Sequence, residues 1–172
     1  MVSPRLLRRV RSLAAEVAPV RWLARIAVGM VAPRHPVGAV GVVFDAEGRV
    51  LLVEHAFRTD YPWGLPGGWV KRGEHPSDAV VRELREELGL DVEVGELIAC
   101  AVVGRVRTST HPVHLGFAYA CELNSGREHL SIEALATDWI DPSTPTMALS
   151  PFQRTAIVAA SERRAAQHPP AR

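Results

Sequence analysis

The spacing of apolar positions changes from strand-like to helix-like along the middle of this chain. Residues 37–44 (VGAVGVVF) and 50–55 (VLLVEH) are short apolar runs separated by the turn-forming residues 45–48 (DAEG), which predicts a β-hairpin. After residue 76, apolar residues recur three and four positions apart, as they do on one face of a helix. The members of this stripe are Val80, Val81, Leu84 and Leu88. We therefore expect a hairpin followed by an amphipathic helix.

Both ends of the predicted helix carry residues that favour helix termini. Pro76 suits the first turn, where its missing N–H is not needed, and Asp78 complements the positive end of the helix dipole. Gly89 can adopt the left-handed conformation that closes many helices. The sequence therefore predicts that the helix begins at Pro76 and ends before Gly89.

The second half of the chain continues with strands and closes with a helix. Residues 91–106 and 113–123 have strand-like apolar runs, and a further segment leads to Trp139. Residues 150–166 predict a last helix. Its expected inner face consists of Phe152, Ala156, Ile157 and Ala160. Strands on both sides of one helix, with another helix at the end, predict a layered domain of the α+β class.

Composition is that of an ordinary globular domain. The 172 residues are 47% hydrophobic and carry a formal net charge of +1, which gives no overall attraction to nucleic acid. Cys100 and Cys121 both lie in apolar, strand-like runs, and we expect both to be small core residues rather than a disulfide or metal pair. Because no secretory signal is evident, the cytoplasm is the expected location.

Residues 1–35 differ from the rest of the chain in charge. They contain seven arginines and a single acidic residue, Glu16, with apolar residues interleaved at helical spacing. No apolar stretch approaches the ~20 residues that a membrane span requires. Three interpretations stay open: a helix packed on the domain or on the partner subunit of a homodimer, a basic amphipathic helix on the inner face of an anionic membrane, and a tail without fixed structure. We expect this extension to precede a domain of residues 36–172.

Three glutamates share one face of the predicted helix. Glu83, Glu86 and Glu87 stand three and four positions apart, so their carboxylates repel one another unless a cation neutralises them. One interpretation is a solvated face with Arg82 and Arg85 as partners. The other is a site for hard divalent cations, which prefer oxygen ligands. Spacing alone does not decide between them.

The glutamates belong to a longer motif. Gly68, Glu74, Arg82-Glu83-Leu84, Glu86-Glu87 and Gly89-Leu90 occur at the spacing G-x5-E-x7-R-E-U-x-E-E-x-G-U, where U is a bulky apolar residue. This is a complete Nudix box, and the chain resembles the Nudix hydrolase family from about residue 37 to Trp139. The approach to the box, W-x-L-P-G-G from Trp63, is also similar to that family.

The resemblance implies a fold and a reaction. The Nudix fold is an α/β/α sandwich, with a mixed β-sheet between helices. Its members usually hydrolyse the diphosphate linkage of a nucleoside diphosphate derivative with the help of Mg²⁺ or Mn²⁺. A nucleotide-type small molecule is therefore the expected substrate, and no nucleic-acid partner is predicted. The alternative is a non-catalytic nucleotide-sensing module whose N-terminal segment contacts membrane or nucleic acid. A non-catalytic relative would usually have lost box glutamates, and this chain keeps all of them.

Site residues follow from the resemblance position by position. It implies that Glu83, Glu86, Glu87 and the Gly67 carbonyl are metal ligands. It also implies that Arg82 and Glu74 orient this cluster. Glu133, six residues before Trp139, is a candidate general base outside the box, and a solvated loop glutamate is the alternative.

Substrate contacts are less strongly marked in the sequence. We expect Arg58, Trp63 and Arg107 to contact the substrate, because an arginine can hold a phosphate and an aromatic ring can stack on a base. Lys71 replaces the acidic residue that many family members have at the third position after the first glycine of the box.

Overall fold

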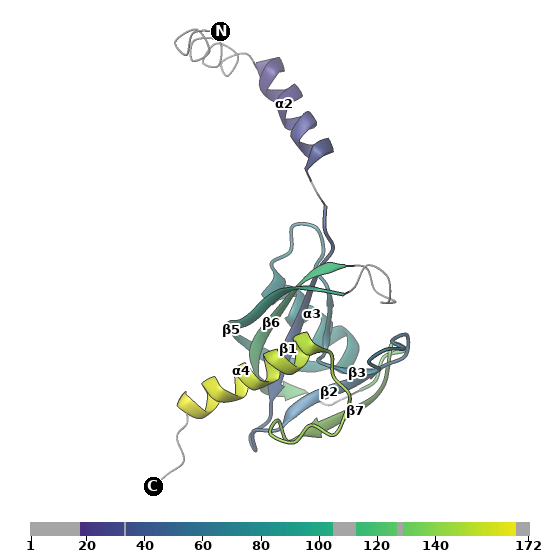
Figure 1. The fold of residues 1–172 in the computed structure, drawn as a ribbon, viewed down its shortest axis with the longest axis vertical. Helices are drawn as coiled ribbons and strands as arrows, with labels where there is room; N and C mark the ends of the chain where they lie inside the picture. Colours follow the sequence, from purple (N-terminus) through teal and green to yellow (C-terminus); the bar gives the residue numbers. More distant parts are fainter. Residues whose placement is uncertain (1–17, 33, 105–112, 127–128, 168–172) are drawn as a thin grey trace. The chain divides into compact units, whose positions relative to one another are not determined.

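The computed structural model describes residues 18–32, 34–104, 113–126 and 129–167 (Figure 1). The chain divides into two compact units, Met1–Arg34 and His35–Arg172. The described part of the first unit contains the helix α2 (Ala18–Val31). Among the described residues, no helix is both long enough and apolar enough to cross a membrane.

The second unit is built on a mixed β-sheet. Its strands are β1 (Val37–Phe44), β2 (Val50–His55), β3 (Trp63–Gly64), β4 (Gly67–Trp69), β5 (Leu90–Val103), β6 (His114–Gly126) and β7 (Ala134–Ile140). The main order is β3-β2-β1-β6-β5, while β4 pairs with β1 and β7 pairs with β2. The β1–β6 pair is parallel and the other pairs are antiparallel.

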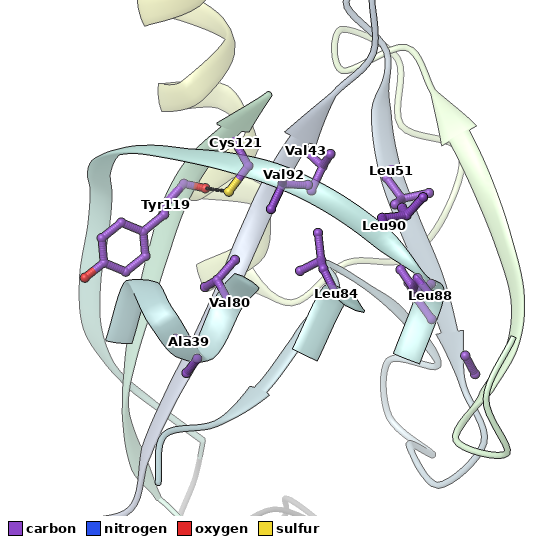
Figure 2. Packing of buried hydrophobic residues seen from close by; sticks show 13 residues of the cluster. Ala39, Val43, Leu51, Val80, Leu84, Leu88, Leu90, Val92, Tyr119 and Cys121 are labelled. Atoms are coloured by element: carbon purple, nitrogen blue, oxygen red, sulfur yellow. Dashed lines mark hydrogen bonds between the residues drawn. The ribbon is translucent and has the colours of Figure 1, made fainter. Parts of the chain in front are cut away.

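Two helices cover opposite faces of this sheet. Alternate residues of β1 and β2 point to opposite sides, so each strand contributes to two cores. One core joins Val43 and Leu51 to the stripe of α3 (Pro76–Leu88), as Figure 2 shows. The other joins Val42 and Leu52 to the inner face of α4 (Pro151–Gln167), which crosses the opposite face of the sheet. The α/β/α sandwich predicted for the domain is therefore confirmed.

Local signals located the ends of α3 correctly. The helix begins at Pro76, after His75, whose ring nitrogen accepts a hydrogen bond from the Ser77 amide. It ends at Gly89, which has φ 66° and donates its N–H to the carbonyls of Arg85 and Leu84. The caps at His75 and Gly89 thus fix the two ends of the helix that carries the acidic face.

One burial prediction was wrong. Cys121 is buried with 1% exposure, but Cys100 is exposed. Cys100 lies on β5 and pairs with Phe117 of β6, and β5 is the last strand of the main sheet order. An apolar strand pattern does not distinguish an edge strand from a central one, so the position of β5 could not be read from its sequence.

Candidate active site

The chain approaches α3 through two glycines that make room for it. Gly67 has φ 140° and pairs with Val40, and a Cβ there would collide with the carbonyl oxygen of Ala39. A Cβ on Gly68 would stand 2.5 Å from the carboxyl carbon of Glu83. The absence of side chains at these two positions therefore lets the carboxylate of Glu83 lie directly on the backbone of β4.

Arg82 connects most of the acidic groups of the box. Its Nε and Nη2 donate to the two carboxylate oxygens of Glu74, at 2.7 and 3.0 Å. Its Nη1 donates to Glu83 Oε1 at 2.6 Å and to Glu86 Oε2 at 3.3 Å. Nη2 also reaches the carbonyl of Trp69 at 3.0 Å. One guanidinium thus ties the loop before α3 to two carboxylates of the helix.

The electrostatics of this cluster follow from these bonds. Hydrogen bonds from Arg82, and then from the Lys71 backbone amide, lower the pKa of Glu74 to about 2. In turn, the Glu74 carboxylate, followed by that of Glu83, raises the pKa of Arg82 above its usual range. Both groups are therefore charged at neutral pH, and they form a frame for Glu83 and Glu86.

Glu87 differs from its neighbours on the same helix face. Its Oε2 is buried and has no hydrogen-bond partner among the described residues. Burial, and then the negative charges of Glu83 and Glu133, raise the pKa of Glu87 to about 7, while Arg58 opposes this shift. A buried carboxylate oxygen without a donor is costly, and it marks the place in the cluster where a proton or a cation would be most stabilising.

Glu133 comes to this cluster from the loop before β7, a later segment of the chain. Its carbonyl accepts a hydrogen bond from the Ala56 amide at 3.0 Å, at the end of β2. Two residues earlier, the Ser131 amide donates to the Glu87 carbonyl at 3.1 Å. The loop before β7 is therefore fastened to both β2 and α3, which puts the charge of Glu133 close enough to affect Glu87.

The predicted substrate contacts have different surroundings. Arg58 lines the cavity beside the glutamates, and burial lowers its pKa while the Glu87 charge opposes this. Trp63 is partly buried and packs against the α4-side core. Arg107 lies outside the described residues. Of the two that the structure describes, Arg58 is thus the one that lies beside the acidic cluster.

The glutamates, Arg82 and Arg58 line one cavity of about 1060 Å³. Glu83, Glu86, Glu87 and Glu133 form its acidic wall. Other parts of the lining are aromatic: Phe57, Tyr61, Trp69, Phe117 and Phe152. Trp69 also makes an edge-on contact with the ring of His114, with centroids 4.9 Å apart. A cavity of this size, acidic at one wall and aromatic elsewhere, can hold a ligand with both a charged and a flat apolar part.

Gln153 is a cavity residue that the sequence did not single out. It is only 7% exposed, and its Oε1 is buried without a hydrogen-bond partner among the described residues. A Cβ on Gly64 would stand 2.5 Å from its Nε2 and 2.7 Å from Nη1 of Arg58, so that glycine makes room for both side chains. The available signal was its spacing, because Gln153 lies three residues before Ala156 on the buried face of α4.

The donor set of the site suits a hard divalent cation. Glu83, Glu86 and Glu87 offer carboxylate oxygens, and Gly67 also lines the cavity with its backbone. In the described part of the chain, however, no three His, Cys, Asp or Glu side chains converge closely enough to hold a metal as they stand. Arg82 binds Glu83 and Glu86, and the unpartnered oxygen of Glu87 is the donor of this set that is left open to a cation.

Comparison with known proteins gives consistent relatives. A MutT-like protein of Streptomyces ambofaciens is 34% identical over 110 residues, which cover 64% of this chain and 66% of that protein. The CTP pyrophosphohydrolase of Escherichia coli strain K12 is 39% identical over 62 residues, 35% of this chain and 46% of that protein. The chain therefore matches just under two thirds of the first relative and about half of the second.

Solved structures agree with the fold. The solution structure of the E. coli ORF135 protein superimposes with a TM-score of 0.60 and 26% identity, over 79% of this chain and 94% of that one. The profile of the NUDIX domain matches residues 34–157, which is well over half of the chain and includes the whole box. The chain therefore belongs to the NUDIX domain family.

Proposed function

We propose that this Nudix hydrolase uses Mg²⁺ or Mn²⁺ to hydrolyse the diphosphate linkage of a nucleoside diphosphate derivative. The observation that carries the proposal is the unpartnered, buried oxygen of Glu87 within a cluster of cavity-facing glutamates. The similarity to a CTP pyrophosphohydrolase and to a MutT-like protein supports a nucleotide substrate.

The metal would be held by Glu83, Glu86, Glu87 and the Gly67 carbonyl. When bound, it supplies positive charge against the diphosphate and lowers the pKa of a coordinated water. The frame made by Arg82 and Glu74 would hold the ligands in position, because five hydrogen bonds tie the guanidinium to Glu74, Glu83, Glu86 and the Trp69 carbonyl. This role is one of positioning, without contact to the reacting atoms.

The remaining charged side chains of the cavity would act on substrate and water. Glu133 stands near Glu87 on a loop fastened to α3, and its carboxylate would accept the proton of the attacking water. Arg58 lies beside the same cluster and would donate to a phosphate oxygen. Lys71, whose Nζ is 3.9 Å from Glu86 Oε1, lies at the exposed rim and would contact the same charged part of the substrate.

The test is hydrolysis of a panel of nucleoside triphosphates, nucleotide sugars and dinucleotides, with product identification, in the presence and absence of Mg²⁺ and Mn²⁺. Glu87→Gln should lower turnover of the best substrate by roughly 10³-fold or more. Glu93→Gln is the matched control, because Glu93 is exposed on β5 and does not line the cavity. Cleavage of nothing in the panel, or equal turnover in the two variants, would contradict the proposal and favour a nucleotide-sensing module instead.

A further inference from the structure

Helix α2 exposes an unusual number of apolar residues. Its 14 residues, APVRWLARIAVGMV, include no acidic side chain, and its only charged side chains are Arg21 and Arg25. Large apolar side chains are exposed along its length: Val20, Trp22, Leu23, Ile26, Val28, Met30 and Val31. The exposed fraction reaches 64% for Trp22 and 82% for Val31. Exposed apolar surface on this scale marks a contact with something other than water.

The apolar residues are not spread evenly around the helix. At about 100° per residue, Trp22, Ile26, Leu23 and Val31 fall within one arc of roughly 180°. Arg21 and Arg25 lie about 40° apart, opposite the centre of that arc. Val28 is an exception, because it lies on the arginine side. The helix therefore has a broad apolar half and a narrow cationic ridge.

The broad apolar half and the arginine ridge of α2 suit contact with a lipid surface better than pairing with another helix. Pairing of two helices uses a narrow apolar stripe, whereas a helix that lies in a bilayer interface presents a wide apolar half with arginines and tryptophan at its margins. Charge complementarity points the same way, since residues 1–35 hold seven arginines against Glu16 alone. At the C-terminal end of the helix, Arg34 Nη2 donates to the Gly29 carbonyl at 2.9 Å and so satisfies a carbonyl of the last turn.

We propose that α2 lies in the interface of an anionic bilayer. The arc around Leu23 enters the acyl-chain boundary, and Arg21 and Arg25 reach the lipid phosphates. A helix of 14 residues is about 21 Å long, well short of the ~30 Å hydrocarbon core, so it lies on the membrane and does not span it. The proposal concerns α2 alone and does not depend on the hydrolase reaction.

The experiment is co-sedimentation of the full chain with vesicles. Vesicles of phosphatidylcholine with roughly one third phosphatidylglycerol should bind the protein, while pure phosphatidylcholine should bind it far less. Replacing both Arg21 and Arg25 by Gln should weaken binding to the anionic vesicles by roughly 30-fold. Higher salt should weaken binding of the wild-type chain in the same direction.

The matched pair of variants is Leu23→Gln and Val28→Gln. Both replace an exposed apolar residue of α2 by the same amide, but only Leu23 lies at the centre of the apolar arc. Leu23→Gln should lower vesicle binding about tenfold or more, and Val28→Gln should leave it within about twofold of wild type. Equal effects of the two variants would overturn the proposal. An absence of binding to the anionic vesicles would also overturn it, and a dimer that Leu23→Gln dissociates would then assign α2 to a second copy of the chain.

Discussion

The contact between Gly68 and Glu83 offers a sharp test of the site, because its size can be worked out from the structure. A Cβ on Gly68 would lie 2.5 Å from the carboxyl carbon of Glu83 and 2.6 and 2.9 Å from its two oxygens. Non-bonded carbon atoms normally approach to about 3.5–4.0 Å. The variant Gly68→Ala therefore requires the Glu83 carboxylate to move by about 1 Å.

Most of this movement should fall on the side chain and not on the fold. Gly68 does not have a positive φ, so alanine suits its backbone, and the atoms nearest to the new Cβ belong to the end of the Glu83 side chain and not to the backbone. We expect the melting temperature of Gly68→Ala to stay within a few degrees of wild type. A ligand misplaced by about 1 Å can reduce turnover by roughly 10²-fold, which is the expected loss of kcat/KM.

The assay is the initial rate of hydrolysis of the best panel substrate across a range of metal concentrations. Gly95→Ala is the control, since Gly95 lies on β5 and a Cβ there would meet only the Ala120 carbonyl oxygen, at 3.3 Å. The control should keep wild-type activity within about twofold. If Gly68→Ala and Gly95→Ala were equally active, the Glu83 carboxylate would not be a metal ligand at the position described.

Two further predictions concern buried polar atoms. Because burial raises the pKa of Glu87 to about 7 from 4.5, this group stabilises the fold below pH 4.5 and loses that contribution as the pH rises through 7. In metal-free buffer, the melting temperature of Glu87→Gln should therefore be higher than that of wild type at about pH 8 and equal to it near pH 4.5. A lower melting temperature of the variant at about pH 8 would refute the reasoning. Gln153→Leu should raise the melting temperature slightly, because it removes an unpartnered buried amide, and should raise KM about tenfold with kcat nearly unchanged. Steady-state kinetics check this, and an unchanged KM would exclude Gln153 from substrate binding.

Local chemistry explains why some of this structure could be predicted. The limits of β1 and β2 match the predicted runs 37–44 and 50–55, because turn residues and apolar alternation act over a few positions. The limits of α3 follow from Pro76 and Gly89 in the same way. The contacts of Arg82 with Glu74 could be expected once the residues of the box were recognised as one motif.

Local patterns do not specify contacts between distant segments, and Glu133 was a candidate only through the family resemblance. Glu133 comes near Glu87 because β7 pairs with β2 and the loop before it bonds to α3, a pairing that no local pattern specifies. Gln153 lies on the buried face of α4 and also lines the cavity, a position that depends on how this helix packs against the sheet. The exposure of Cys100 depends likewise on which strand ends the sheet.

The tertiary structure also gives the glutamates of the box different electrostatic surroundings, although the motif does not distinguish them. Among the described residues that line the cavity, Asp60 and four glutamates carry five negative charges when Glu87 is ionised. Three positive charges on Arg58, Lys71 and Arg82 leave a formal charge of −2. Because Arg82 is already shared among Glu74, Glu83 and Glu86, this excess is least compensated at Glu87. A diphosphate is itself an anion, so the cavity as it stands would repel the substrate proposed for it. Under the proposed mechanism, divalent cations would therefore be needed for substrate binding as well as for the chemical step. As the metal concentration is raised from zero, KM should fall at lower concentrations than those at which kcat rises.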